Sequence, residues 1–223
     1  TPATYTLIGI NLLVFVAMVA ADTRTLGGSI TSAHADLGLS RSILQGHILG
    51  LDRLLIPAHQ WYRLATSGFI HFGVFHIAMN MLLLYQLGVL LERAIGSGRL
   101  VALYVACLFS GSLGVLLVDK GSLTGGASGA VFGLMAAAAI GMHRRGINVF
   151  RTGIGTTLML NLVLTFTING VSIGGHLGGI VGGVICGFVM FAPPWKPLPK
   201  WAAWLTPVAV TVVAIAASVA LGS

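Results

Sequence analysis

The chain has 223 residues, of which 56% are hydrophobic and only 8% charged, with 31 glycines and a formal net charge of +7. A soluble domain carries about a quarter charged residues, so this composition excludes that class and indicates an integral membrane protein. The positive charges form no basic stripe, so we expect no nucleic-acid partner and attribute them to topology and to contact with anionic lipid of the bilayer.

Seven apolar stretches approach the roughly 17 to 25 residues that a helix needs to cross hydrocarbon. We therefore expect an all-α fold, a polytopic transmembrane helical bundle with six core helices and a seventh. Residues 1–192 are expected to form the core, and residues 193–223 a proline-containing linker and an accessory helix without chemistry of its own. The expected spans lie near residues 5–21, 74–91, 100–118, 127–142, 152–168, 173–192 and 202–221.

The charged residues of the loops predict the orientation of these spans. One set of loops holds seven Lys and Arg against the single acid Glu92, and the other holds five against four acids. Because cytoplasmic loops are rich in Lys and Arg, the first set is expected to be cytoplasmic, with Glu92 in a short turn. The start of the chain then lies inside, and Ser128 lies near the outer face. The chain begins at Thr1 without Met, so we expect further residues upstream.

The segment 22–73 is too long for a turn and too mixed to cross the bilayer. Its apolar patches, which include Ile43 and Leu44, and its aromatic residues predict an interfacial loop half-embedded in the outer leaflet. Its histidines, His34, His47 and His59, are expected to be solvated.

Three polar residues open the second span: His71, His76 and Asn80. His76 and Asn80 are four residues apart and therefore share one helix face. Burying such groups costs about 1 to 3 kcal/mol each unless they are hydrogen-bonded. A single one is more often a contact between helices, but a pair at the outer mouth favours function. His71, at the entry, could be structural.

Glycines recur at every fourth position on the fourth and sixth spans. Small residues at this spacing let two helices approach closely in lipid, so these faces are expected to pack together. Ser128 and His176 adjoin the outer ends of the two faces, each next to a stripe glycine, and would then meet. The stripes are Gly129, Gly133, Ala137 and Gly141 on the fourth span, and Gly175, Gly179, Gly183 and Gly187 on the sixth.

A serine hydroxyl is a weak nucleophile that needs an adjacent base, usually histidine. No acidic residue occurs within any span, so Ser128 and His176 would form a dyad rather than a triad. Attack on an amide also builds an oxyanion, for which His76, Asn80 and the Ser128 amide at a helix start could supply donors. We expect no cofactor and no metal, since no carboxylate or thiolate is placed to join the histidines. Cys107 and Cys186 are expected to be buried apolar thiols.

These motifs resemble those of the rhomboid intramembrane serine proteases, over the six spans from residue 5 to residue 192. The similar elements are Gly126-Ala127-Ser128-Gly129, His71-x4-His76-x3-Asn80 and Gly175-His176-Leu177-Gly178-Gly179, with Trp61-Tyr62-Arg63, Glu92-Arg93 and Gly96-Ser97-Gly98 in the loops.

The resemblance implies Ser128 as nucleophile, His176 as general base, and His76, Asn80 and the Ser128 amide as the oxyanion hole. Gly126, Gly129, His71 and Phe132 would support them. It also implies single-span membrane proteins as substrates, cut near the outer face of a bacterial inner membrane. It further implies a lateral gate near the second and fifth helices and a capping loop around 168–173.

Two features depart from the family pattern: Phe132 stands where many members have Tyr, and the seventh helix lies outside the six-helix core. The Phe132 ring could still stack on His176. Two other classes remain open, a non-catalytic relative that binds membrane helices, and a channel, transporter or metal binder that uses His71, His76 and His176.

Overall fold

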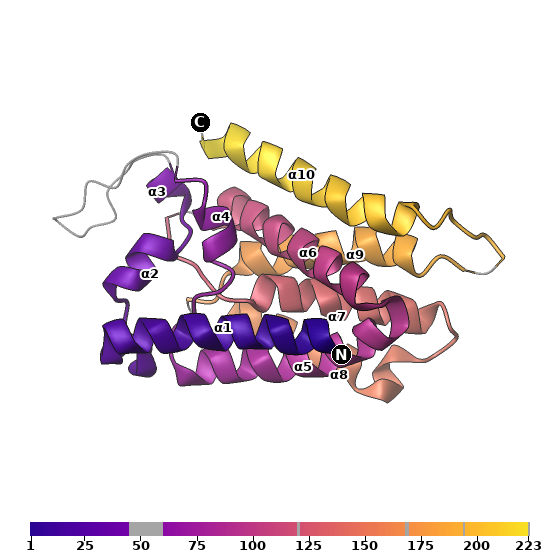
Figure 1. Cartoon of the computed structure of the whole chain (residues 1–223), viewed down its shortest axis with the longest axis horizontal. Helices are drawn as coiled ribbons and strands as arrows, with labels where there is room; N and C mark the ends of the chain where they lie inside the picture. Colours follow the sequence, from indigo (N-terminus) through magenta and orange to yellow (C-terminus); the bar gives the residue numbers. More distant parts are fainter. Residues whose placement is uncertain (45–59, 120, 168–169, 194, 223) are drawn as a thin grey trace.

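The computed structural model describes residues 1–44, 60–119, 121–167, 170–193 and 195–222 (Figure 1). Within these residues the protein is a bundle of helices without a strand, which confirms the predicted fold class. The described residues include five helices long and apolar enough to cross a membrane. They are α1 (Pro2–Ala21), α5 (Val74–Ile95), α6 (Ser97–Val118), α9 (Ile173–Met190) and α10 (Ala202–Gly222).

The fourth and fifth expected spans form helices that are shorter than a full crossing. Helix α7 (Ser128–His143) has 16 residues and α8 (Ile154–Thr167) has 14. At about 1.5 Å per residue, α7 is about 24 Å long, less than the ~30 Å of a hydrocarbon core. The remaining elements are η1 (Thr23–Gly27), α2 (Ser32–Leu37), α3 (Arg41–Leu44), α4 (Arg63–Thr66) and η2 (Val149–Thr152).

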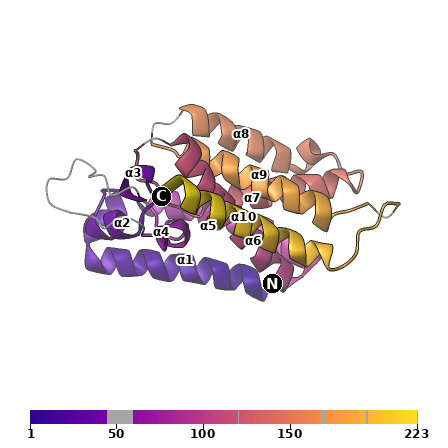
Figure 2. The same ribbon diagram turned by 90° about the horizontal axis from the view of Figure 1, so that it is seen from above.

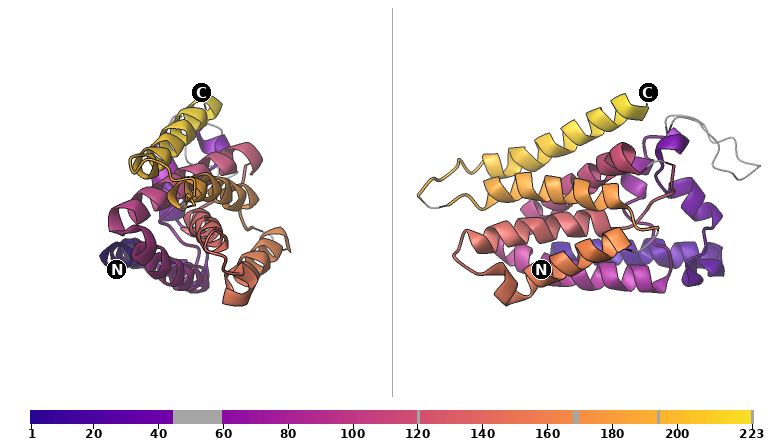
Figure 3. Two further views of the ribbon diagram at one scale, coloured as in Figure 1. Left: turned by 90° about the vertical axis from the view of Figure 1, so that its right-hand side faces the viewer. Right: turned by 180° about the vertical axis from the view of Figure 1, so that it is seen from behind.

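Helix α7 lies at the centre of the bundle, and seen end-on α1, α8 and α10 occupy three corners around it (Figure 3). The glycine stripes of α7 and α9 meet as predicted. A Cβ on Gly133 would lie 2.6 Å from the carbonyl oxygen of Gly179, which is too close for any side chain. Helix α9 carries a second row of glycines, Gly174, Gly178 and Gly182, which packs against α6. A Cβ on Gly178 would lie 3.0 Å from the Cα of Gly114. Glycine therefore lets α9 touch two helices by backbone at once.

Glu92 lies inside α5 rather than in a turn, which corrects the prediction for this residue. Its carboxylate accepts hydrogen bonds from the backbone N–H groups of Ala3 and Thr4, both at 2.9 Å, and from the hydroxyls of Thr4 (2.6 Å) and Ser97 (2.7 Å). The first N–H groups of a helix lack partners within the helix, so this buried carboxylate caps the start of α1.

The described parts of segment 22–73 contain short helices and buried side chains, and form a folded cap over one end of the bundle. Ile43 and Leu44 are fully buried, and Leu44 packs with Leu64 and Leu116, so these two side chains face protein, whereas the depth of the segment in the bilayer stays a prediction. Arg63 is 1% exposed, and its Nη1 donates to the carbonyl oxygens of Ala35 (2.6 Å) and Gly38 (2.8 Å). The carbonyl groups of the cap thus hold the guanidinium, and burial lowers the pKa of Arg63.

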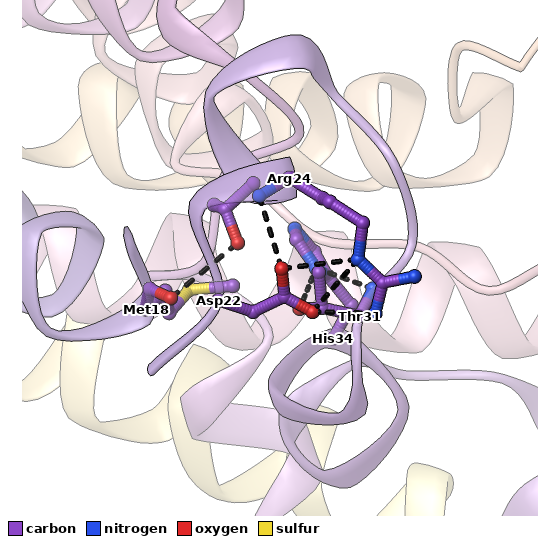
Figure 4. Close-up of polar contacts among 6 residues, drawn as sticks. Met18, Asp22, Arg24, Thr31 and His34 are labelled. Atoms are coloured by element: carbon purple, nitrogen blue, oxygen red, sulfur yellow. Dashed lines mark hydrogen bonds and ion pairs between the residues drawn. The ribbon is translucent and has the colours of Figure 1, made fainter. Parts of the chain in front are cut away.

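His34 is also buried, which corrects the prediction that it is solvated, whereas His47 and His59 lie outside the described residues. The backbone N–H of Thr31 donates to His34 Nδ1 over 3.2 Å, and Figure 4 shows this pair beside the turn that follows α1. An ion pair closes that turn, with Arg24 Nη2 2.6 Å from Asp22 Oδ2.

Helix α10 runs along α6 and α9 on the outside of the bundle (Figures 1 and 3). The Trp204 ring covers Gly98 at one end of α10, and Trp61 lies against Gly222 at the other. The N-terminus and the C-terminus lie at opposite ends of the bundle (Figure 1). The end that carries α2, α3 and α4 also carries the start of α7, because Leu39 and Thr124 pair by two backbone hydrogen bonds.

Candidate active site

Ser128 and His176 come together where α7 and α9 begin. His176 Nε2 lies 2.8 Å from Ser128 Oγ, within hydrogen-bonding distance. The contact follows from the glycine stripes, since Gly129 and Gly175 directly neighbour the two residues and a Cβ on Gly129 would lie 3.1 Å from the Gly175 carbonyl oxygen. His176 is 6% exposed, whereas Ser128 is partly exposed. The hydroxyl is therefore held against an imidazole and remains open to a reactant.

His76 faces the same space from α5. A methyl group placed on Gly126 would lie 2.9 Å from His76 Nε2 and 3.8 Å from Ser128 Oγ, so the imidazole edge and the hydroxyl border one small volume. The backbone N–H of Phe72 donates to His76 Nδ1 over 3.3 Å. Since Nδ1 accepts, a neutral His76 carries its proton on Nε2, which points toward Gly126. Gly126 has φ +130° and this close neighbour, so only glycine fits there.

Asn80 lies one turn further along α5 and is 5% exposed. Its Nδ2 donates to the backbone carbonyl of His76 over 2.9 Å. An amide group has two N–H donors, so one remains for another acceptor. The structure thus places Asn80 on the His76 face as predicted, with one hydrogen engaged by its own helix.

The loop that leads into Ser128 is held by the cap. The N–H of Gly126 donates to the Ser67 carbonyl over 2.7 Å, and the N–H of Ala127 donates to His71 Nε2 over 3.4 Å. His34 Nε2 in turn lies 3.1 Å from the His71 carbonyl oxygen. Burial, reinforced by the neighbouring His76, lowers the pKa of His71 to about 3, and burial also lowers the pKa of His34. Both are neutral near pH 7 and serve as positioning groups.

Helix α9 is capped by residues that the sequence did not single out. The Ser172 hydroxyl accepts from the N–H of Gly175 over 2.9 Å and itself donates to the carboxylate of Asp119. Asp119 also accepts from the N–H of Gly174 over 3.1 Å. This double cap fixes the first turn of α9, which carries His176.

The other polar and aromatic neighbours of His176 come from α7 and α8. Phe132 stacks on the imidazole, with ring centroids 4.0 Å apart and planes 18° from parallel, as its position in the sequence suggested. Thr165 of α8 places its Oγ1 2.7 Å from His176 Nδ1. The sequence alone gave no indication of this contact.

A cavity of about 40 Å³ adjoins Ser128. Its lining includes the hydroxyl-bearing residues Ser67, Ser112, Thr124 and Ser172, and its volume is sufficient for a water molecule with polar partners. Among the described residues, no three His, Cys, Asp or Glu side chains gather where they could hold a metal ion. Cys107 and Cys186 are both free and buried.

The structure is thus a helical membrane bundle in which a serine and a histidine are in contact at the ends of two glycine-faced helices. These features are those of the intramembrane serine protease class that the sequence motifs resemble. The sequence profile described as the rhomboid domain matches residues 58–193, more than half of the chain. The chain belongs to the rhomboid family and is an integral membrane protein.

Curated relatives agree with this assignment. The chain is 32% identical to "Rhomboid protease GluP" of Bacillus subtilis over 127 residues, which cover 56% of this chain and 25% of that protein. It is 42% identical to "Rhomboid protease GlpG" of Serratia proteamaculans over 77 residues, covering 34% and 27%. With "RHOMBOID-like protein 1" of Arabidopsis thaliana the identity is 40% over 84 residues, covering 38% and 22%. The matches span about a quarter of the length of these relatives.

Proposed function

We propose that this protein is an intramembrane serine endopeptidase that cleaves single-span membrane proteins near the outer face by a Ser128–His176 dyad. The 2.8 Å contact between Ser128 Oγ and His176 Nε2 carries the proposal. Membership of the rhomboid family supports it, since two of the relatives are named proteases.

In the proposed reaction, Ser128 Oγ attacks the scissile carbonyl carbon while its proton passes to His176 Nε2. The carbonyl oxygen becomes an oxyanion, which the Nε2–H of His76, the free amide hydrogen of Asn80 and the N–H of Ser128 stabilise. The C–N bond then breaks, and the proton on Nε2 moves to the leaving amine. Water next attacks the acyl-enzyme, gives a proton to Nε2 and releases the new carboxyl terminus with return of the proton to Ser128 Oγ.

The length of α7 supports a site below the membrane surface. Helix α6 has 22 residues and α7 has 16, so α7 is about 9 Å shorter along the bundle. A serine at the start of the shorter helix would lie beneath the headgroups, where the end of a substrate helix can reach it. The cavity beside Ser128 would have room for a water molecule in the second half of the reaction.

The experiment is cleavage of a panel of single-span membrane proteins by the purified protein in lipid vesicles, with the new termini sequenced. We expect cuts near the outer end of the substrate span, which Ser128→Ala and His176→Ala each abolish. If the wild type binds these helices without cutting any of them, the protein is a non-catalytic helix binder and the proposal is wrong.

A further inference from the structure

The contact between α8 and the imidazole of His176 involves more than packing. Thr165 is 2% exposed, and its Oγ1 lies 2.7 Å from His176 Nδ1. The same oxygen lies 2.7 Å from the backbone carbonyl oxygen of Asn161, one turn earlier in α8. Both ring nitrogens of His176 are thus engaged, Nε2 by Ser128 and Nδ1 by Thr165.

The number of hydrogens along this chain of contacts determines which ring nitrogen is protonated. The threonine hydroxyl has one hydrogen, and a carbonyl oxygen can only accept. If that hydrogen is donated to Asn161, Thr165 Oγ1 can only accept from the ring, so Nδ1 carries the proton of neutral His176. Nε2 then has a free lone pair directed at Ser128, which is the form a general base requires.

Few buried side chains hold α8 in place. Only Gly155 and Thr165 of its 14 residues are buried, and the helix lies at the edge of the bundle opposite α1 (Figure 2). The Thr165 hydroxyl therefore links the outer half of α8 to the reacting group. A displacement of this end of the helix would remove the acceptor from Nδ1.

The geometry points to Thr165 as the positioning residue of the dyad: it accepts the Nδ1 hydrogen of His176 and so fixes the tautomer that can deprotonate Ser128. The population of that tautomer then depends on the position of α8 against the bundle. This inference rests on the proposed function, in which His176 is the base. Thr165 touches neither substrate nor the reacting atoms. Its role is that of the third member of a triad, filled by a neutral hydroxyl in place of a carboxylate.

The test compares three variants in lipid vesicles. Thr165→Val removes the acceptor with little change of shape, Thr165→Ser keeps it, and Thr167→Val is the matched control. Thr167 makes the same kind of bond, 2.9 Å to the carbonyl oxygen of Val163, but is exposed and has no histidine partner. We expect Thr165→Val to lower kcat about 10- to 100-fold with KM nearly unchanged, because a buried Nδ1–H loses its partner. Thr165→Ser should restore kcat, and Thr167→Val should leave it unchanged.

The second readout is the ring of His176 itself, followed by nitrogen NMR with labelled histidine. The wild type and Thr165→Ser should show neutral imidazole protonated at Nδ1, and Thr165→Val should shift the population toward protonation at Nε2. The inference is overturned if Thr165→Val keeps the wild-type tautomer, or if Thr165→Val and Thr167→Val lower kcat alike. Failure of the proposed function is distinguishable, because then the wild type cuts no substrate while the NMR comparison still reports on Thr165.

Discussion

Substituting one stripe glycine should separate the two residues of the dyad. A Cβ on Gly179 would collide with the carbonyl group of Gly129, lying 2.7 Å from its carbon and 3.2 Å from its Cα. Relieving this clash requires α7 and α9 to move apart by about 0.5 to 1 Å, because rigid backbone lies on both sides. The same shift would stretch the 2.8 Å contact between Ser128 and His176 beyond hydrogen-bonding distance.

We therefore expect Gly179→Ala to lower the free energy of unfolding by about 1 to 3 kcal/mol and the rate of cleavage by about 100-fold. The matched control is Gly9→Ala in α1, where an added Cβ meets nothing within 4 Å. Because alanine favours helix more than glycine does, this control should be neutral or slightly stabilising. Thermal unfolding and cleavage are measured on both variants in the same lipid. If Gly179→Ala behaves like Gly9→Ala, the reasoning from close helix contact is refuted.

Three further predictions concern single polar groups. Asn80→Ala should lower kcat much more than it raises KM, since the oxyanion exists only along the reaction path, and an equal loss of both would make Asn80 a packing residue. Glu92→Gln should lower the free energy of unfolding by about 1.5 to 3 kcal/mol through loss of charged hydrogen bonds to α1. An unchanged unfolding midpoint would show that the Glu92 carboxylate does not stabilise the start of α1. Because the pKa of His71 is about 3 when folded and 6.5 in its ordinary state, the unfolded chain takes up a proton that the folded protein does not as pH falls below 6.5. Stability should therefore be full above pH 6.5 and decline toward pH 3 by up to about 1.4 kcal/mol per pH unit, and His71→Asn should flatten a plot of the unfolding midpoint against pH.

The features that could be predicted from the sequence are those in which residues of one kind recur at the spacing of a helix turn. The four-residue spacing of glycines on α7 and α9 predicts which faces meet, and Ser128 and His176 adjoin those faces, so their proximity follows from this local pattern. The shared face of His76 and Asn80 follows in the same way from a spacing of four.

The features that could not be predicted depend on partners distant in the chain. His34 resembles a surface histidine in sequence, and its burial depends in part on a hydrogen bond between its Nε2 and the distant carbonyl oxygen of His71. Glu92 resembles a charged loop residue in sequence, and the sequence does not show that the N–H groups at the start of α1 lie beside its carboxylate. A threonine in an apolar helix most often bonds back to its own helix, as Thr165 does, and nothing in the sequence indicates that the same oxygen also meets His176.

The most direct test of the dyad is mass spectrometry of the whole protein, held in lipid, after exposure to a serine-directed fluorophosphonate. We predict one adduct, located on Ser128, that is absent from Ser128→Ala and strongly reduced in His176→Ala. A wild-type protein that stays unlabelled, or an adduct on another serine, would contradict it.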